Sequence, residues 1–162
     1  MNVERVNRPS VQVCGIAERT NNQVEAGPEG KISGLWGQFF QHGLLQQPGL
    51  NPEFIYGLYT EYESDVNGEY TVLLGCETTG EGSSDQLNHF KTVSVSVPAS
   101  DYLVFTSNLG PVDTVVPEIW QEIWSYFQEC KESRTYTGDF ELYKVAGFDP
   151  SNTVVQIYIA VK

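Results

Sequence analysis

Basic residues are scarce in this 162-residue chain: nine Lys and Arg stand against 21 Asp and Glu, which gives a formal net charge of −12. Binding to nucleic acid depends on Lys and Arg side chains that neutralise phosphates, so we expect no direct nucleic-acid partner. The negative potential of the chain would instead attract and concentrate a cation. The alternative is that the charge serves only to keep the protein in solution.

Long apolar runs are also missing. No stretch approaches the roughly 20 apolar residues that a membrane helix needs, and the first residues, MNVERVNRPSVQV, lack the apolar run of a signal peptide. Cysteine is rare as well: Cys14, Cys76 and Cys130 are widely spaced and form no CxxC motif. These absences argue against a membrane partner and a disulfide framework, and they predict a cytoplasmic protein.

Residues with obvious chemistry are few. His42 and His89 are isolated from each other and from the cysteines, so we predict no metal site. The chain has no GxSxG nucleophile motif and no phosphate-binding glycine loop. We therefore predict no cofactor and name no catalytic residue.

Aromatic residues, in contrast, are frequent: three Trp, nine Tyr and eight Phe make up 12% of the chain. Large rings usually fill a hydrophobic core, so each one is either a core residue or a ligand contact. A length of 162 residues fits one domain that spans 1–162.

The chain repeats itself with an offset of 84 residues. This offset aligns the YGLY of 56–59 with the FELY of 140–143, and Trp36 with Trp120. It also aligns 71–75 with 155–159 and, more weakly, Val11 and Val13 with Val95 and Val97. Several elements that keep one offset in the same order indicate an internal duplication.

Each half reads as strand, helix, strand, strand. The first repeat spans about 9–77, residues 78–88 form a polar linker, and the second repeat spans about 89–162. The expected strands are 11–16, 54–62, 69–77, 91–99 with 101–106, 139–145 and 154–162, and the helices are 31–41 and a segment that begins near Asp113 or Thr114. We predict an α+β fold of two pseudo-symmetric βαββ repeats that form one antiparallel sheet, with two main helices on one face. A groove is expected where the repeats meet.

Glu141 differs from its counterpart in the repeat, which is Gly57. Strand alternation puts Glu141 and Tyr143 on one face, and it puts Gly57 and Tyr59 on the equivalent face of the other half. A carboxylate, two rings and the space left by a glycine suit a flat cation, which would offset the unfavourable desolvation of the acid. The alternative is that Glu141 faces solvent, and Trp36 and Trp120 are either core residues or part of the ligand cage.

Three segments carry a resemblance to a known family: EIWQEIWSYF at 118–127, FELY at 140–143 and the closing VQIYIAVK at 155–162. With them the chain resembles the GyrI-like superfamily, which includes the effector-binding domains of AraC- and MerR-type multidrug regulators and the DNA gyrase inhibitory proteins. The resemblance implies a pocket between helices and sheet, a buried glutamate at Glu141 that contacts cationic drugs, and a closing-strand tyrosine at Tyr158 near the ligand. Ala160 stands where the family often has proline.

The repeat fills residues 9–162, so a helix-turn-helix DNA reader does not fit beside it. The chain is similar to stand-alone members, such as those of integron cassettes that bind cationic drugs. We expect a binding protein for lipophilic or aromatic cations that acts alone or with a separate regulator protein. An exposed edge strand or apolar stripe would be the surface for a homodimer. Two alternatives are an interaction module like the gyrase inhibitors and a small hydrolase that uses Glu141 as acid or base.

Overall fold

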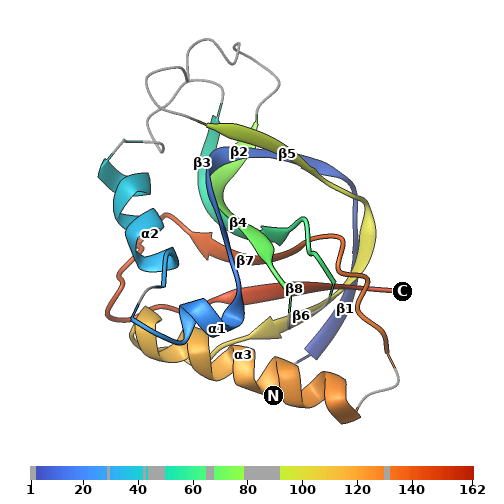
Figure 1. Cartoon of the computed structure of the whole chain (residues 1–162). Helices are drawn as coiled ribbons and strands as arrows, with labels where there is room; N and C mark the ends of the chain where they lie inside the picture. Colours follow the sequence, from blue (N-terminus) through green and yellow to red (C-terminus); the bar gives the residue numbers. More distant parts are fainter. Residues whose placement is uncertain are drawn as a thin grey trace.

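A computed structural model describes residues 3–28, 30–41, 43, 50–64, 68–78, 92–129 and 132–162. Within these residues it has eight strands in one antiparallel sheet and three helices, which confirms the predicted α+β class (Figure 1). The strands are β1 (Val3–Arg8), β2 (Val11–Thr20), β3 (Leu50–Thr60), β4 (Tyr70–Thr78), β5 (Val93–Val97), β6 (Ser100–Thr106), β7 (Asp139–Lys144) and β8 (Gln156–Val161). The helices are α1 (Asn22–Glu25), α2 (Ile32–Gln41) and α3 (Val112–Glu129).

The sheet has the strand order β1-β6-β8-β7-β3-β4-β2-β5. Strands β3 and β7 are therefore neighbours at its centre, and their register pairs Gly57 directly with Glu141. These two residues are also the ones that the 84-residue offset aligns. The carboxylate on β7 thus lies beside the glycine position of β3, in the middle of the sheet.

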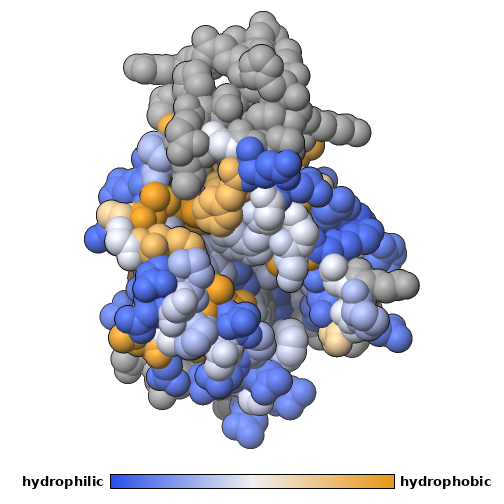
Figure 2. All heavy atoms as spheres, turned by 90° about the vertical axis from the view of Figure 1, so that its left-hand side faces the viewer, coloured by the Kyte–Doolittle hydropathy of each residue, from blue (hydrophilic) through white to orange (hydrophobic). Residues whose placement is uncertain are grey.

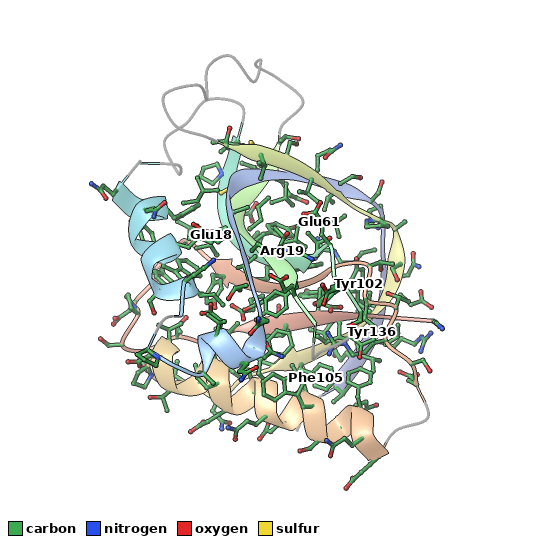
Figure 3. The ribbon with its side chains drawn as sticks, viewed as in Figure 1. Glu18, Arg19, Glu61, Tyr102, Phe105 and Tyr136 are labelled. Atoms are coloured by element: carbon green, nitrogen blue, oxygen red, sulfur yellow. The ribbon has the colours of Figure 1, made fainter. Side chains whose placement is uncertain are left out.

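The two faces of the sheet have different coverings. One face packs in a cluster that contains buried residues of both long helices, namely Leu35, Phe39, Ile119 and Ile123. The alternate strand side chains form a second cluster that contains no helix residue. Figure 3 labels one residue of each: Phe105, whose ring centroid is 5.3 Å from that of Tyr126 on α3, and Tyr102, which is 5.4 Å from Phe140. Helices α2 and α3 thus pack against the same face.

Side chains near the helix ends accept hydrogen bonds from backbone amides there. Asn21 caps α1 by accepting a hydrogen bond from the Val24 amide. Glu25 at the end of α1 accepts from the amides of Lys31 (2.8 Å) and Ile32 (3.1 Å), so it satisfies donors at the start of α2. Helix α3 starts at Val112, slightly before the predicted cap, and includes Pro117. No helix in the described residues is long and apolar enough to cross a membrane.

Strands β1 and β5 pair across the two halves of the chain. Strand β1 was not expected, and it pairs with β6 of the second half. Strand β5 pairs with β2 of the first half, with Val11 opposite Val97 and Val13 opposite Val95. The central pair of this ladder, Gln12 and Ser96, has the 84-residue offset, as Gly57 and Glu141 do in the β3–β7 ladder. The two ladders share one register, interrupted only at 9–10 and 98–99. The edge strand beside the second half, β1, thus comes from the start of the chain, and the edge strand beside the first half, β5, comes from the second half. Residues 65–67, between β3 and β4, and residues 79–88 of the expected linker lie outside the described residues.

Candidate functional site

Glu141 is buried, with 3% of its surface exposed, and its carboxylate accepts three hydrogen bonds. The Tyr143 hydroxyl donates to Oε1 at 2.6 Å. The Tyr59 hydroxyl and the Trp120 indole N–H both donate to Oε2, at 2.8 and 2.7 Å. Strands β3 and β7 and helix α3 therefore converge on one carboxylate. The alternative that Glu141 faces solvent is excluded.

No basic side chain among the described residues forms a salt bridge with this carboxylate. Burial raises the pKa of Glu141, and the hydrogen bonds from Tyr143, Trp120 and Tyr59 partly oppose this by stabilising the ionised form. Burial, and then the nearby Glu141 charge, raises the pKa of Tyr59 and of Tyr143 well above the usual value. The tyrosines thus remain neutral donors. None of the salt bridges among the described residues includes Glu141.

Gly57 provides the room for the carboxylate. A Cβ atom at this position would lie 3.3 Å from Glu141 Oε1 and 3.5 Å from Glu141 Cβ. A larger side chain on β3 would therefore occupy the space that Glu141 now fills. Because Gly57 and Glu141 are paired across the two strands, the missing side chain at Gly57 leaves space for the Glu141 carboxylate.

A cavity of about 380 Å³ adjoins this group. Tyr59 and Trp120 both line the cavity and donate hydrogen bonds to Glu141, so these two side chains lie between the cavity and the carboxylate. Their ring centroids are 5.2 Å apart in an edge-to-face arrangement. The other lining residues come from α1 and its C-cap, the start of α2, the segment after β3, β4, α3 and the segment before β7, namely Asn22, Glu25, Ala26, Ile32, Tyr62, Tyr70, Val116, Pro117, Gln121, Trp124 and Arg134. Five of the thirteen lining residues are aromatic, and the volume is in the range of small-molecule sites.

A second buried acid, Asp139, lies two residues before Glu141 on the same face of β7. Unlike Glu141 it has a basic partner: Arg134 Nη2 donates to its Oδ2 at 2.7 Å. The Tyr62 hydroxyl and the Ala160 amide also donate to Asp139. The two acids therefore differ in charge balance, because within the described part of the chain Asp139 has a basic partner and Glu141 has none.

The structure brings five of the seven predicted site residues together: Glu141, Tyr143, Tyr59, Trp120 and Gly57. Trp36 lies one contact further away, with its ring centroid 5.0 Å from that of Tyr143. It also stacks on Phe40, which is 48% exposed on α2. Figure 2 views this side of the molecule and shows apolar side chains between hydrophilic ones.

Tyr158 is not brought to this group. It pairs with Phe140 across β7 and β8 and stacks on it at 4.6 Å, in the core cluster of the other sheet face. Arg8 covers both rings there. The residue whose side chain lies on the Glu141 face at this point of β8 is Ile157, the strand partner of Glu141.

Sequence reasoning predicted only Tyr59 and Trp120 of the thirteen lining residues, and it missed, among others, Tyr62, Tyr70, Arg134 and the neighbouring Asp139. Strand alternation offered a signal for two of them. Asp139 shares the face of Glu141, and Tyr70 starts the strand that pairs with β3. Arg134 lies in an irregular segment, where no periodicity predicts the direction of a side chain.

Comparison with known proteins was decisive for the family. The model of Cass2, the integron-associated effector binding protein family, matches residues 5–161. The chain belongs to the Cass2 family. The predicted resemblance to GyrI-like effector-binding domains is thereby confirmed. YobU, a proposed transcriptional regulator of Bacillus subtilis (strain 168), is 37% identical to this Cass2-family chain over 152 residues, which are 92% of the chain and 91% of YobU.

Solved structures show the same fold for this Cass2-family protein. An integron cassette protein from the mobile metagenome of Vibrio cholerae is 35% identical, with a TM-score of 0.80 over 99% of this chain and 95% of that one. SAV2435 bound to tetraphenylphosphonium is 23% identical, with a TM-score of 0.77 over 100% and 94%. The EcmrR C-terminal domain is 16% identical, with a TM-score of 0.61 over 99% and 97%.

Proposed function

We propose that this Cass2-family protein binds lipophilic aromatic cations in the cavity beside Glu141. The observation that carries the proposal is the buried, unpaired carboxylate directly behind the aromatic wall of Tyr59 and Trp120. We assign ligand contact to Tyr59 and Trp120, charge recognition to Glu141, and positioning of its carboxylate to Tyr143 and Gly57. Trp36 packs edge-to-face against the ring of Tyr143 and helps to hold it in place.

The physical argument concerns the desolvated charge. An ionised carboxylate that is removed from water is unfavourable unless it is paired, and the described residues give Glu141 hydrogen-bond donors but no salt bridge. A cationic ligand would supply the missing charge. Each ring face that it contacts would add about 0.5–2 kcal/mol of cation–π attraction, depending on desolvation. A neutral or anionic molecule of the same shape would gain the apolar contacts without the charge term.

The relatives support this choice of ligand. SAV2435, which shares the fold, binds tetraphenylphosphonium, a lipophilic cation with four aromatic rings. The Cass2 family consists of integron-associated effector binding proteins, which agrees with a cavity of small-molecule size. We therefore take tetraphenylphosphonium as the first probe for this chain.

We also infer that the cavity arose at the junction of two duplicated βαββ units. Support comes from the central pairing of β3 with β7, in which Gly57 and Glu141, equivalent under the 84-residue offset, face each other. In this interpretation one copy kept a glycine and the other acquired the acid. The asymmetry of the pocket then follows from one difference between otherwise matching strands.

The test uses two ions of nearly the same shape and opposite charge, tetraphenylphosphonium and tetraphenylborate. Calorimetry or quenching of Trp fluorescence is expected to show saturable binding of the cation and none of the anion. With the charges about 6 Å apart and an effective dielectric constant of about 20, their attraction is about 3 kcal/mol, so Glu141→Gln is expected to weaken binding of the cation roughly 100-fold.

The matched control is Glu53→Gln, which removes the same charge from an exposed position on β3. It is expected to leave the affinity for tetraphenylphosphonium within about twofold, because screening by salt weakens interactions between exposed charges. Equal binding of the two ions, or equal effects of the two substitutions, would contradict the proposed role of Glu141.

A further inference from the structure

Arg134 is a buried cation on the wall of the same cavity. Its side chain is 4% exposed, and it lines the cavity together with Tyr62 and Trp120. Nη2 is engaged by Asp139, but the buried Nε has no hydrogen-bond partner among the described residues. A buried N–H of a charged group without an acceptor is unfavourable, and native structures seldom leave one unused.

The surroundings hold this guanidinium in place. The ring of Tyr136 lies over it, with the centroid 4.5 Å from Cζ, and the rings of Tyr62 and Phe127 lie at about 6 Å. Tyr136 has a φ of 55°, a conformation that is uncommon for a residue other than glycine. The backbone of Arg134 is fixed by a β-bridge to Val161. Arg134 is therefore a built part of the cavity wall and differs from a surface arginine.

The charges around the cavity indicate which kind of acceptor can take a hydrogen bond from Arg134 Nε. Among the buried groups, Arg134 and Asp139 form a neutral pair, and Glu141 leaves one negative charge that a monovalent cation balances. A carboxylate on the ligand would add negative charge to a site that already holds these two buried acids and the partly buried Glu25 on its wall. A neutral acceptor, such as a ketone or amide oxygen, would satisfy the N–H group without adding charge.

We propose that Arg134 is a specificity-determining residue that donates a hydrogen bond to a neutral acceptor oxygen of the bound cation. The ligand class is then an aromatic cation whose charged end is directed to Glu141 and whose other end carries a carbonyl or similar oxygen. Asp139 and Glu141, which mark the two ends, are two residues apart on one face of β7, or about 7 Å. This inference rests on the proposed function, because it assumes that the cation occupies the cavity.

The test compares two probes that differ in one group. The 4-acetyl and 4-isopropenyl derivatives of phenyltrimethylammonium have the same charge and almost the same shape, but only the acetyl compound has an acceptor oxygen. Calorimetric titration of the full chain is expected to give about tenfold tighter binding of the acetyl compound, as a hydrogen bond to a charged donor provides. Equal affinities would overturn this inference, although binding of both cations would still agree with the proposed function.

A paired substitution assigns the preference to Arg134. Arg134→Met with Asp139→Asn removes the donor without leaving a buried unpaired acid, and it is expected to reduce the affinity ratio of the two probes to about one. Arg134→Lys, which keeps a cation beside Asp139 and lacks Nε, is the second variant and should lower the ratio as well. The matched control is Arg5→Met with Asp101→Asn, which removes an exposed ion pair. A tenfold ratio that survives in both Arg134 variants would overturn the inference.

Discussion

The two oxygens of Glu141 have unequal hydrogen bonding, and this predicts unequal effects of two Tyr→Phe substitutions. Oε1 receives its hydrogen bond from Tyr143, whereas Oε2 receives one from Tyr59 and another from Trp120. Tyr143→Phe therefore leaves one oxygen of a buried carboxylate without a donor. Tyr59→Phe leaves both oxygens with a donor. Both changes retain the ring and create almost no cavity.

The magnitude follows from this difference. Loss of a hydrogen bond to a charged, buried acceptor is worth about 1.5–3 kcal/mol, and we expect Tyr143→Phe to lower the free energy of unfolding by this amount. Tyr59→Phe should lower it by about 0.5–1.5 kcal/mol, because Trp120 still donates to Oε2 at 2.7 Å. For a domain of this size each kcal/mol shifts the melting temperature by about 2–4 °C.

The effect should depend on pH with a defined sign. Burial raises the pKa of Glu141 in the folded chain, and the Tyr143 hydrogen bond lowers it, so Tyr143→Phe raises it further. The penalty for ionising Glu141 on folding is complete above the folded pKa and absent below the ordinary value of 4.5. The stability gap between the wild type and Tyr143→Phe should therefore be widest at neutral pH and narrow as the pH falls towards 4.5.

Urea unfolding followed by Trp fluorescence, from pH 8 to pH 4.5, measures both effects. Tyr158→Phe is the control, because Tyr158 lies on the other face of the sheet. Loss of its hydroxyl group should change the free energy of unfolding by less than about 0.5 kcal/mol. The reasoning is refuted if Tyr143→Phe and Tyr59→Phe are equally destabilising at pH 7, or if the gap widens as the pH falls.

Three further substitutions test the surroundings of the site. Glu141→Gln should raise the urea midpoint of the ligand-free protein at pH 7 while Glu53→Gln does not, because it removes an acid whose ionisation burial disfavours; a lower midpoint would count against this. Gly57→Val should weaken tetraphenylphosphonium binding more than tenfold in calorimetry, since its side chain would displace the carboxylate; unchanged binding would contradict the assigned position. Gly15→Ala should cost more than about 3 kcal/mol or prevent folding, as circular dichroism would show, because its Cβ would lie 1.9 Å from the Leu74 carbonyl oxygen; a stable variant would refute the close approach of β2 and β4.

Much of the central sheet and of the Glu141 group could be predicted from sequence. The 84-residue offset aligned Gly57 with Glu141, and strand alternation placed Tyr59 and Tyr143 on the matching faces, because period-two patterns determine which side chains share a face. Trp120 lies on the apolar stripe of α3, which faces the same side of the sheet.

The remainder depended on strand register and on irregular backbone. The side of the sheet to which Tyr158 belongs depends on its pairing with Phe140, and a shift of one residue would have reversed it. The polar, partly exposed strand β1 shows no clean alternation, since its burial changes irregularly along Val3–Arg8. Arg134 and Tyr136 take their positions from a loop with an unusual φ, which local sequence patterns do not specify.

The exchange of β1 and β5 between the two halves has a mechanical consequence. Because each half is bordered by a strand that continues into the opposite half, neither half can detach without breaking the β1–β6 and β2–β5 ladders together. Amide hydrogens of β2 and β6 should then exchange with solvent through a single cooperative opening event. The two halves of the sheet should therefore stay together when a large ligand binds. Side chains and helices around the cavity would then have to adjust to ligands of different shape.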